Sequence, residues 1–214
     1  MRGPGSFLKI PAFRQCLLQI ILRPPLQEPR GGTSQTRYTS RVADAFRILG
    51  IDPGSLVTGF GVLEPRGSRL VLIEAGCIRP RATAPLGVRL ADVHRALVEI
   101  VERVRPTHAA IEEVFFAKNV KSAIALGHAR GVAMASVAAA GVELFEYAPT
   151  EVKRAVVGTG RAEKEQVAHM VKVLLGPDAA KMVQGQRLDV TDACAIAICH
   201  ANTWRTKERI AGAR

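Results

Sequence analysis

A single carboxylate, Asp52, ends an apolar run that has the composition of a β-strand. The run covers residues 48–51, and Pro53-Gly54 breaks it directly after the aspartate. A charge that leaves a hydrophobic strand loses water, which is costly unless the charge is paired or binds a metal. The chain then returns through residues 57–63, so we expect a β-hairpin with Asp52 at its rim. An aspartate before Pro-Gly is also ordinary turn chemistry, so Asp52 alone does not define a site.

The charge of the chain limits its partners. The 214 residues have a formal net charge of +11 and a pI near 10.2, and 48% are hydrophobic, which is enough for a packed core. Residues 1–44 have a net charge of +5, so residues 45–214 retain +6. Such a surface favours a polyanionic partner, either nucleic acid or an anionic membrane surface. No apolar stretch approaches 20 residues, so a conventional transmembrane helix is excluded.

The four cysteines give no sign of a metal or disulfide framework. Cys16, Cys77, Cys194 and Cys199 have no CxxC spacing and no histidine cluster suited to zinc. We therefore expect reduced, buried thiols in a cytoplasmic protein.

The chain divides into three parts by composition. Residues 1–45 are basic and poor in acids, which predicts a disordered leader, a mitochondrial presequence, an arm that touches DNA phosphates, or a misassigned start upstream of Val42. Residues 46–204 form the predicted domain. Residues 205–214 form a basic tail that we expect to be frayed.

The hydrophobic periodicity predicts an α/β fold. After the hairpin, residues 69–78 read as a third strand, residues 108–114 as a fourth and residues 142–147 as a fifth. Helical spacing marks residues 86–104, 120–140, 149–157, 161–175 and 188–202, with a Gly/Pro/polar loop at 176–187. This order indicates a mixed sheet of three antiparallel and then two parallel strands, flanked by helices.

Further carboxylates recur where elements begin or end. The fourth strand ends in Glu112 and Glu113, of which only one can face Asp52, because neighbouring strand residues point to opposite sides. Asp189 and Asp192 share one face of the last helix, which is otherwise apolar and therefore buried. Simple N-terminal capping could explain Asp189 but explains Asp192, a turn further in, less well.

These carboxylates suggest a metal-dependent reaction. Oxygen ligands without histidine or cysteine suit magnesium or manganese rather than zinc. Two such ions about 4 Å apart can activate a water and stabilise the leaving oxygen of a phosphodiester. Together with the basic surface, the carboxylates favour nucleic-acid hydrolysis.

Five segments, in order, carry a resemblance to a known family. They are ILGIDPGSLVTGFGV, AAIEEVFFAKN, ALGHARGVA, FEYAPTEVKRAVVGTGRAEKEQV and DVTDACAIAICH, and the resemblance covers about residues 47–202. The chain resembles RuvC-type Holliday-junction resolvases, which are crossover junction endodeoxyribonucleases of the RNase H-like superfamily. The leader, the loop at 176–187 and the bulky Val190-Thr191 pair depart from the family pattern.

The resemblance implies a function and a site. It implies resolution of four-way DNA junctions by paired nicks in opposed strands, during recombination and repair. It also implies a homodimer that works with RuvA and RuvB, and two Mg²⁺ per active site, with Mn²⁺ as a substitute. The catalytic and metal-binding residues implied are Asp52, Glu112, Asp189 and Asp192.

The expected DNA contacts have structural alternatives. By the resemblance, Phe115 lies near the crossover and Lys153 and Lys164 lie near the scissile phosphate. Phe115 could equally be a core residue, Lys153 a solvated residue, and Lys164 a partner of its neighbours Glu163 and Glu165. The basic residues Lys118, Lys121 and Arg130 complete the candidate DNA contacts.

Two other protein classes compete with this prediction. An actin-like ATPase or sugar kinase has a similar Asp-Pro-Gly-Ser hairpin, but those folds need two lobes and the predicted domain provides one. A non-catalytic DNA-binding protein could keep the fold and the basic face. Four intact acidic positions argue against that alternative.

Overall fold

The computed structural model describes residues 45–113 and 120–212, and within them five strands form one mixed sheet. The strand order is β3-β2-β1-β4-β5. The first three strands pair antiparallel, and β4 and β5 are added in parallel. The strands are β1 (Ile48–Asp52), β2 (Thr58–Arg66), β3 (Arg69–Ile78), β4 (His108–Glu112) and β5 (Glu143–Tyr147). The predicted fold class is confirmed.

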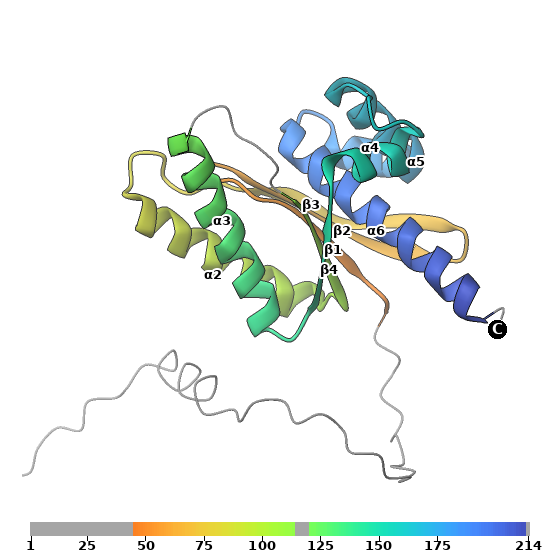
Figure 1. The fold of residues 1–214 in the computed structure, drawn as a ribbon, viewed down its shortest axis with the longest axis horizontal. Helices are drawn as coiled ribbons and strands as arrows, with labels where there is room; N and C mark the ends of the chain where they lie inside the picture. Colours follow the sequence, from red (N-terminus) through yellow and green to blue (C-terminus); the bar gives the residue numbers. More distant parts are fainter. Residues whose placement is uncertain (1–44, 114–119, 213–214) are drawn as a thin grey trace, which may run out of the picture. The chain divides into compact units, whose positions relative to one another are not determined.

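Helices cover both faces of this sheet (Figure 1). On one face lie α2 (Leu86–Val104) and α3 (Val120–Ala139), which pack on side chains such as Leu49, Ile51 and Ile111. On the other face lie α4 (Pro149–Val157), α5 (Lys164–Val183) and α6 (Leu188–Gly212). The described part of the chain contains no helix that is both long and apolar enough to cross a bilayer.

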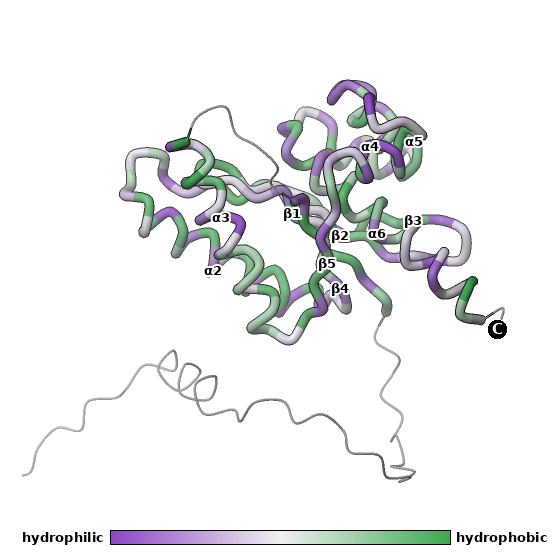
Figure 2. Tube along the Cα trace, in the orientation of Figure 1, coloured by the Kyte–Doolittle hydropathy of each residue, from purple (hydrophilic) through white to green (hydrophobic). Residues whose placement is uncertain are grey.

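Helix α6 lies unusually close to the sheet, and glycines in the strands permit it. A Cβ on Gly59 of β2 would stand 2.0 Å from the carbonyl oxygen of Asp189, and one on Gly50 of β1 would stand 2.1 Å from that of Ala193. Only a residue without a side chain fits such an approach. The part of α6 that lies over the strands is mainly hydrophobic (Figure 2). The strand glycines therefore set the position of the first turns of α6.

Two predicted boundaries are wrong. The loop expected at residues 176–187 is shorter, because α5 resumes after a kink at Gly176-Pro177 and continues to Val183, where Ala179 and Val183 are buried. The tail expected to fray after Trp204 continues α6 to Gly212. Arg205 holds this extension by donating hydrogen bonds to the carbonyl oxygens of the β2–β3 turn, at 2.9 Å from that of Gly67.

The expectation of buried thiols holds for two of the three described cysteines, whereas Cys77 is half-buried. Cys77, Cys194 and Cys199 are free, and the last two are buried. Cys16 lies outside the described residues, as does the leader up to residue 44.

Candidate active site

Three elements bring carboxylates to one edge of the sheet. Asp52 and Glu112 are the last residues of β1 and β4, which are parallel neighbours, so their carboxyl ends meet at the same edge. Helix α6 begins above this edge and supplies Asp189 and Asp192. Gly59 pairs with Asp52 in the sheet and touches the backbone of Asp189, which fixes β1 and α6 against each other.

Asp52 is close enough to the other three carboxylates for their charges to act on its ionisation. Burial, followed by the charges of Asp192, Glu112 and Asp189, raises the pKa of Asp52 from its ordinary value of 3.8 to about 7. Burial also raises the pKa of Glu112 and that of Asp192. Because neighbouring carboxylates make each other harder to ionise, the cluster favours a bound cation.

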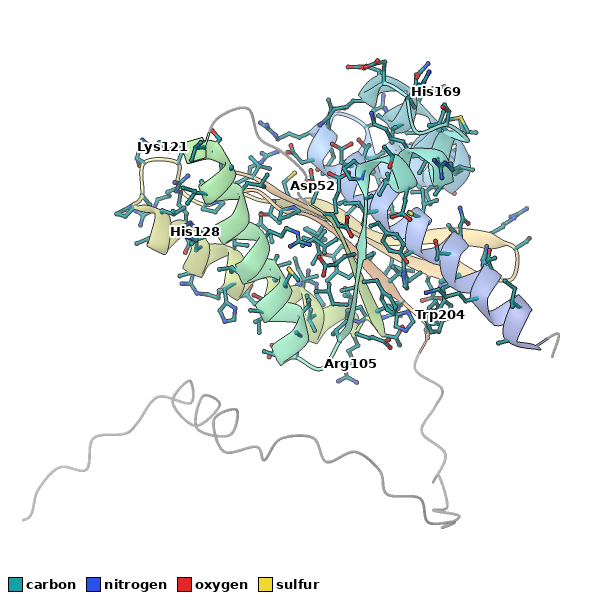
Figure 3. All side chains as sticks on the ribbon, in the orientation of Figure 1. Asp52, Arg105, Lys121, His128, His169 and Trp204 are labelled. Atoms are coloured by element: carbon teal, nitrogen blue, oxygen red, sulfur yellow. The ribbon has the colours of Figure 1, made fainter. Side chains whose placement is uncertain are left out.

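A small cavity of about 90 Å³ opens at three of the carboxylates. Asp52, Glu112 and Asp192 line it, together with Lys153 and Lys164. The Nζ atom of Lys164 lies 3.4 Å from Oδ2 of Asp192. Figure 3 shows Asp52 between α3 on one side and helices α4, α5 and α6 on the other. We call this space the lysine cavity.

Asp189 faces a different space from the other three carboxylates. It lines a second cavity of about 490 Å³, which the loop at residues 54–57 also lines. Its Oδ2 atom accepts a hydrogen bond from Nε of Arg187 at 2.9 Å. We call this space the arginine cavity.

The structure decides between Glu112 and Glu113. Glu112 lines the lysine cavity with Asp52, and Glu113 is not among the described residues that line it. Glu112 is therefore the residue that joins Asp52.

The donor set suits a hard cation. All four groups offer carboxylate oxygens, which magnesium and manganese prefer. In the part of the chain that the structure describes, no three His, Cys, Asp or Glu side chains are already arranged to hold a metal ion. Lys164 and Arg187 neutralise Asp192 and Asp189 instead. The residues fit a divalent cation in kind, and binding requires the carboxylates to draw together.

The candidate DNA contacts fall into three groups. Lys153 and Lys164 line the lysine cavity, and Lys121 lines the arginine cavity at the start of α3 (Figure 3). Arg130 donates from Nε to the carbonyl oxygen of Glu112 at 3.1 Å and pairs with Glu146. Phe115 and Lys118 lie outside the described residues.

Two cationic residues at this edge were not predicted. Arg187 comes two residues before Asp189, so the sequence itself could have suggested that the two side chains pair. Arg89 comes from α2 and reaches the loop carbonyl of Ser55 across 34 residues of sequence, so no local pattern marks it.

This strand order, with acidic residues at the ends of β1 and β4 and on the last helix, defines an RNase H-like nuclease. The family described as crossover junction endodeoxyribonuclease RuvC matches residues 48–200. The chain therefore belongs to the RuvC family, whose members are metal-dependent endodeoxyribonucleases.

Individual relatives agree with this assignment. The chain is 46% identical over 165 residues to the crossover junction endodeoxyribonuclease RuvC of Pelotomaculum thermopropionicum, which covers 76% of this chain and 98% of the relative. It is 46% identical over 158 residues to that of Geotalea uraniireducens, covering 73% and 89%. Among solved structures, Thermus thermophilus RuvC in complex with a Holliday junction substrate matches with a TM-score of 0.69 and 33% identity, covering 76% and 96%.

Proposed function

We propose that the protein resolves four-way DNA junctions in the cytoplasm, during recombination and repair, by nicking opposed strands with Asp52, Glu112, Asp189 and Asp192 as the catalytic carboxylates. The observation that supports this most directly is the convergence of these groups at one edge of the sheet, where the other three all raise the pKa of Asp52. The relatives are named for the same activity, and one was solved with a Holliday junction substrate.

The four carboxylates would hold two Mg²⁺ ions, with Mn²⁺ as a substitute. When bound, the ions would lower the pKa of the attacking water and stabilise negative charge on the scissile phosphate and the leaving oxygen. Asp52 is the central ligand in this proposal, because the charges of the other three all act on it. A cation at the site would keep Asp52 ionised at neutral pH, where the pKa of about 7 otherwise leaves it partly protonated.

The two lysines of the lysine cavity would orient the DNA. Lys153 and Lys164 line the space that Asp52, Glu112 and Asp192 also line, so they can hold phosphate oxygens next to the reacting group. Lys164 also bonds Asp192, so it can pass from the carboxylate to the phosphate as DNA enters. Such charge-assisted contacts fix the strand relative to the carboxylates.

Paired nicks require two sites in a fixed relation. A four-way junction presents two equivalent strands, and a two-fold homodimer offers two equivalent sites. We therefore propose a homodimer that acts with the RuvA and RuvB branch-migration proteins. Its DNA contacts would include Lys121. They would also include Phe115 and Lys118, which lie outside the described residues.

Cleavage of a synthetic four-way junction tests the function. The wild type should nick opposed strands with Mg²⁺ and not in EDTA. The Asp52→Asn variant should bind the junction and cut more than about 100-fold more slowly, since a ligand matters at least as much as the residues that support it. The matched control is Asp178→Asn, which removes an exposed carboxylate of α5 and should cut at the wild-type rate. Cleavage by Asp52→Asn at the normal rate, or none by the wild type, would refute the assignment.

A further inference from the structure

The arginine cavity has the features of an anion site. The first turns of three helices meet at it: Arg89 lies in that of α2, Lys121 in that of α3, and Asp189 in that of α6. Helix N-termini carry partial positive charge and exposed N–H groups, so each favours an anion. The loop at residues 54–57 closes the remaining side.

The charged side chains around this cavity are mostly cationic. Arg89, Lys121 and Arg187 line it, and the described lining residues include one carboxylate, that of Asp189. Arg187 pairs with that carboxylate at 2.9 Å, which reduces its repulsion of an incoming anion. The charged residues of the lining, Arg89, Lys121, Arg187 and Asp189, therefore carry a net formal charge of +2, and Asp189 links the cavity to the carboxylate cluster.

Arg89 has unused hydrogen-bonding capacity. Its Nη1 atom donates to the carbonyl oxygen of Ser55 at 3.3 Å, which is a long bond. Its Nε atom is buried and has no hydrogen-bond partner among the described residues. A buried N–H without an acceptor is costly, and a guanidinium can give two parallel bonds to a phosphate. A turn of the side chain toward the cavity would bring Nε to such an acceptor.

We infer that the arginine cavity binds a backbone phosphate of the scissile strand other than the phosphate that is cut, with Arg89 as its principal ligand. This inference rests on the proposed function. The two cavities are lined by different carboxylates of the cluster. Asp52, Glu112 and Asp192 line the lysine cavity, and Asp189 lines the arginine cavity. The strand would thus be held by cationic groups on both sides of the reacting phosphate.

The test is junction binding without divalent metal, so that cleavage plays no part. Arg89→Gln should weaken binding about 10-fold, which corresponds to the loss of one charge-assisted contact. The slope of log affinity against log salt should fall by about 1. The matched control is Arg95→Gln, which removes an exposed arginine of the same helix that pairs with Asp92 and should change the affinity less than twofold.

Methylphosphonate substitutions in the junction identify the phosphate. One uncut position close to the cleavage site should weaken wild-type binding about 10-fold and should not weaken Arg89→Gln further. Equal methylphosphonate effects in both proteins at every position, or affinity of Arg89→Gln equal to that of Arg95→Gln, would overturn the inference. If Arg89→Gln does not fold, Arg89→Lys keeps the charge without the fork and should show a smaller loss at the same position. Failure of the wild type to nick an unmodified junction with Mg²⁺ would instead contradict the proposed function.

Discussion

Helix α6 carries buried ionisable groups at two places, and their surroundings differ in how far they compensate for burial. At its start, Asp189 and Asp192 join Asp52 and Glu112, and the pKa of Asp52 rises to about 7. Three turns further on, His200 is buried with both ring nitrogens hydrogen-bonded at 2.8 Å, one to Tyr147 Oη and the other to His108 Nδ1. Figure 3 shows Trp204, in the turn after His200, well away from Asp52.

The difference indicates what each group of residues is for. Around His200, aromatic rings and hydrogen bonds compensate for burial, and burial lowers the pKa of His200 to about 4, so the ring stays neutral. At the carboxylate end, like charges are gathered with only partial neutralisation by Lys164 and Arg187. Satisfied buried polar groups stabilise a fold, whereas unsatisfied charges are retained for a ligand.

The largest expected effect on stability is at the histidine end. His200→Ala removes both hydrogen bonds and leaves a cavity, so the free energy of unfolding should fall by about 3 kcal/mol. At 25 °C, where the variant remains folded, junction cleavage should keep its wild-type rate. Urea denaturation measures the free energy of unfolding, and a junction-cleavage assay measures the rate. His169→Ala, at an exposed position of α5, is the control and should change stability by less than about 0.5 kcal/mol. A loss of cleavage in folded His200→Ala would contradict the claim that the histidine end serves stability alone.

A smaller loss of stability, with a large loss of activity, is expected at Gly59. A Cβ at this position meets the carbonyl oxygen of Asp189 at 2.0 Å, so Gly59→Ala must push α6 away from β2. Unfolding should become easier by about 2 kcal/mol, and cleavage should slow by about 10²-fold, because a shift near 1 Å misplaces a reacting group.

The control for Gly59 is a glycine with open space around it. A Cβ added to Gly87 in α2 would have no atom of a neighbouring element within 4 Å, so Gly87→Ala should leave cleavage unchanged. If Gly59→Ala cuts as fast as the wild type, the close approach of α6 does not position Asp189.

Local patterns predicted most of the fold. The apolar composition of residues 69–78 and the helical spacing along residues 86–104 each gave the observed element, because both depend on near neighbours in sequence. The end of α5 was mispredicted because Gly176-Pro177 has the signature of a terminator, while burial of Ala179 and Val183 lets the helix resume. The end of α6 was mispredicted because Arg205 is held by carbonyls more than 130 residues away.

The sequence predicted the acidic residues of the candidate site but not all of its cationic residues. The three-residue spacing of Asp189 and Asp192 and the strand-end positions of Asp52 and Glu112 were visible in the sequence, as was the resemblance to the RuvC family. The strand pattern alone left Glu112 and Glu113 open, the family resemblance implied Glu112, and Glu112 is the one that lines the lysine cavity with Asp52. Arg89 could not be found, since its place beside Ser55 depends on how α2 packs against the hairpin loop.

The pH dependence of stability tests the central claim, that the carboxylate end is built for a cation. The pKa of Asp52 is about 7 in the folded chain and near 3.8 when unfolded, so ionising it costs stability as pH rises through that window, and the cost is absent below it. Without metal, Asp52→Asn should therefore melt a few degrees above the wild type at pH 8, and the gap should close as the pH falls toward 4.

Mg²⁺ completes this measurement. Adding it at pH 8 should raise the melting temperature of the wild type and should barely change that of Asp52→Asn, because a ligand that binds only the folded state stabilises it. Equal Mg²⁺ effects on both proteins, or a metal-free wild type that melts above Asp52→Asn at pH 8, would contradict the account.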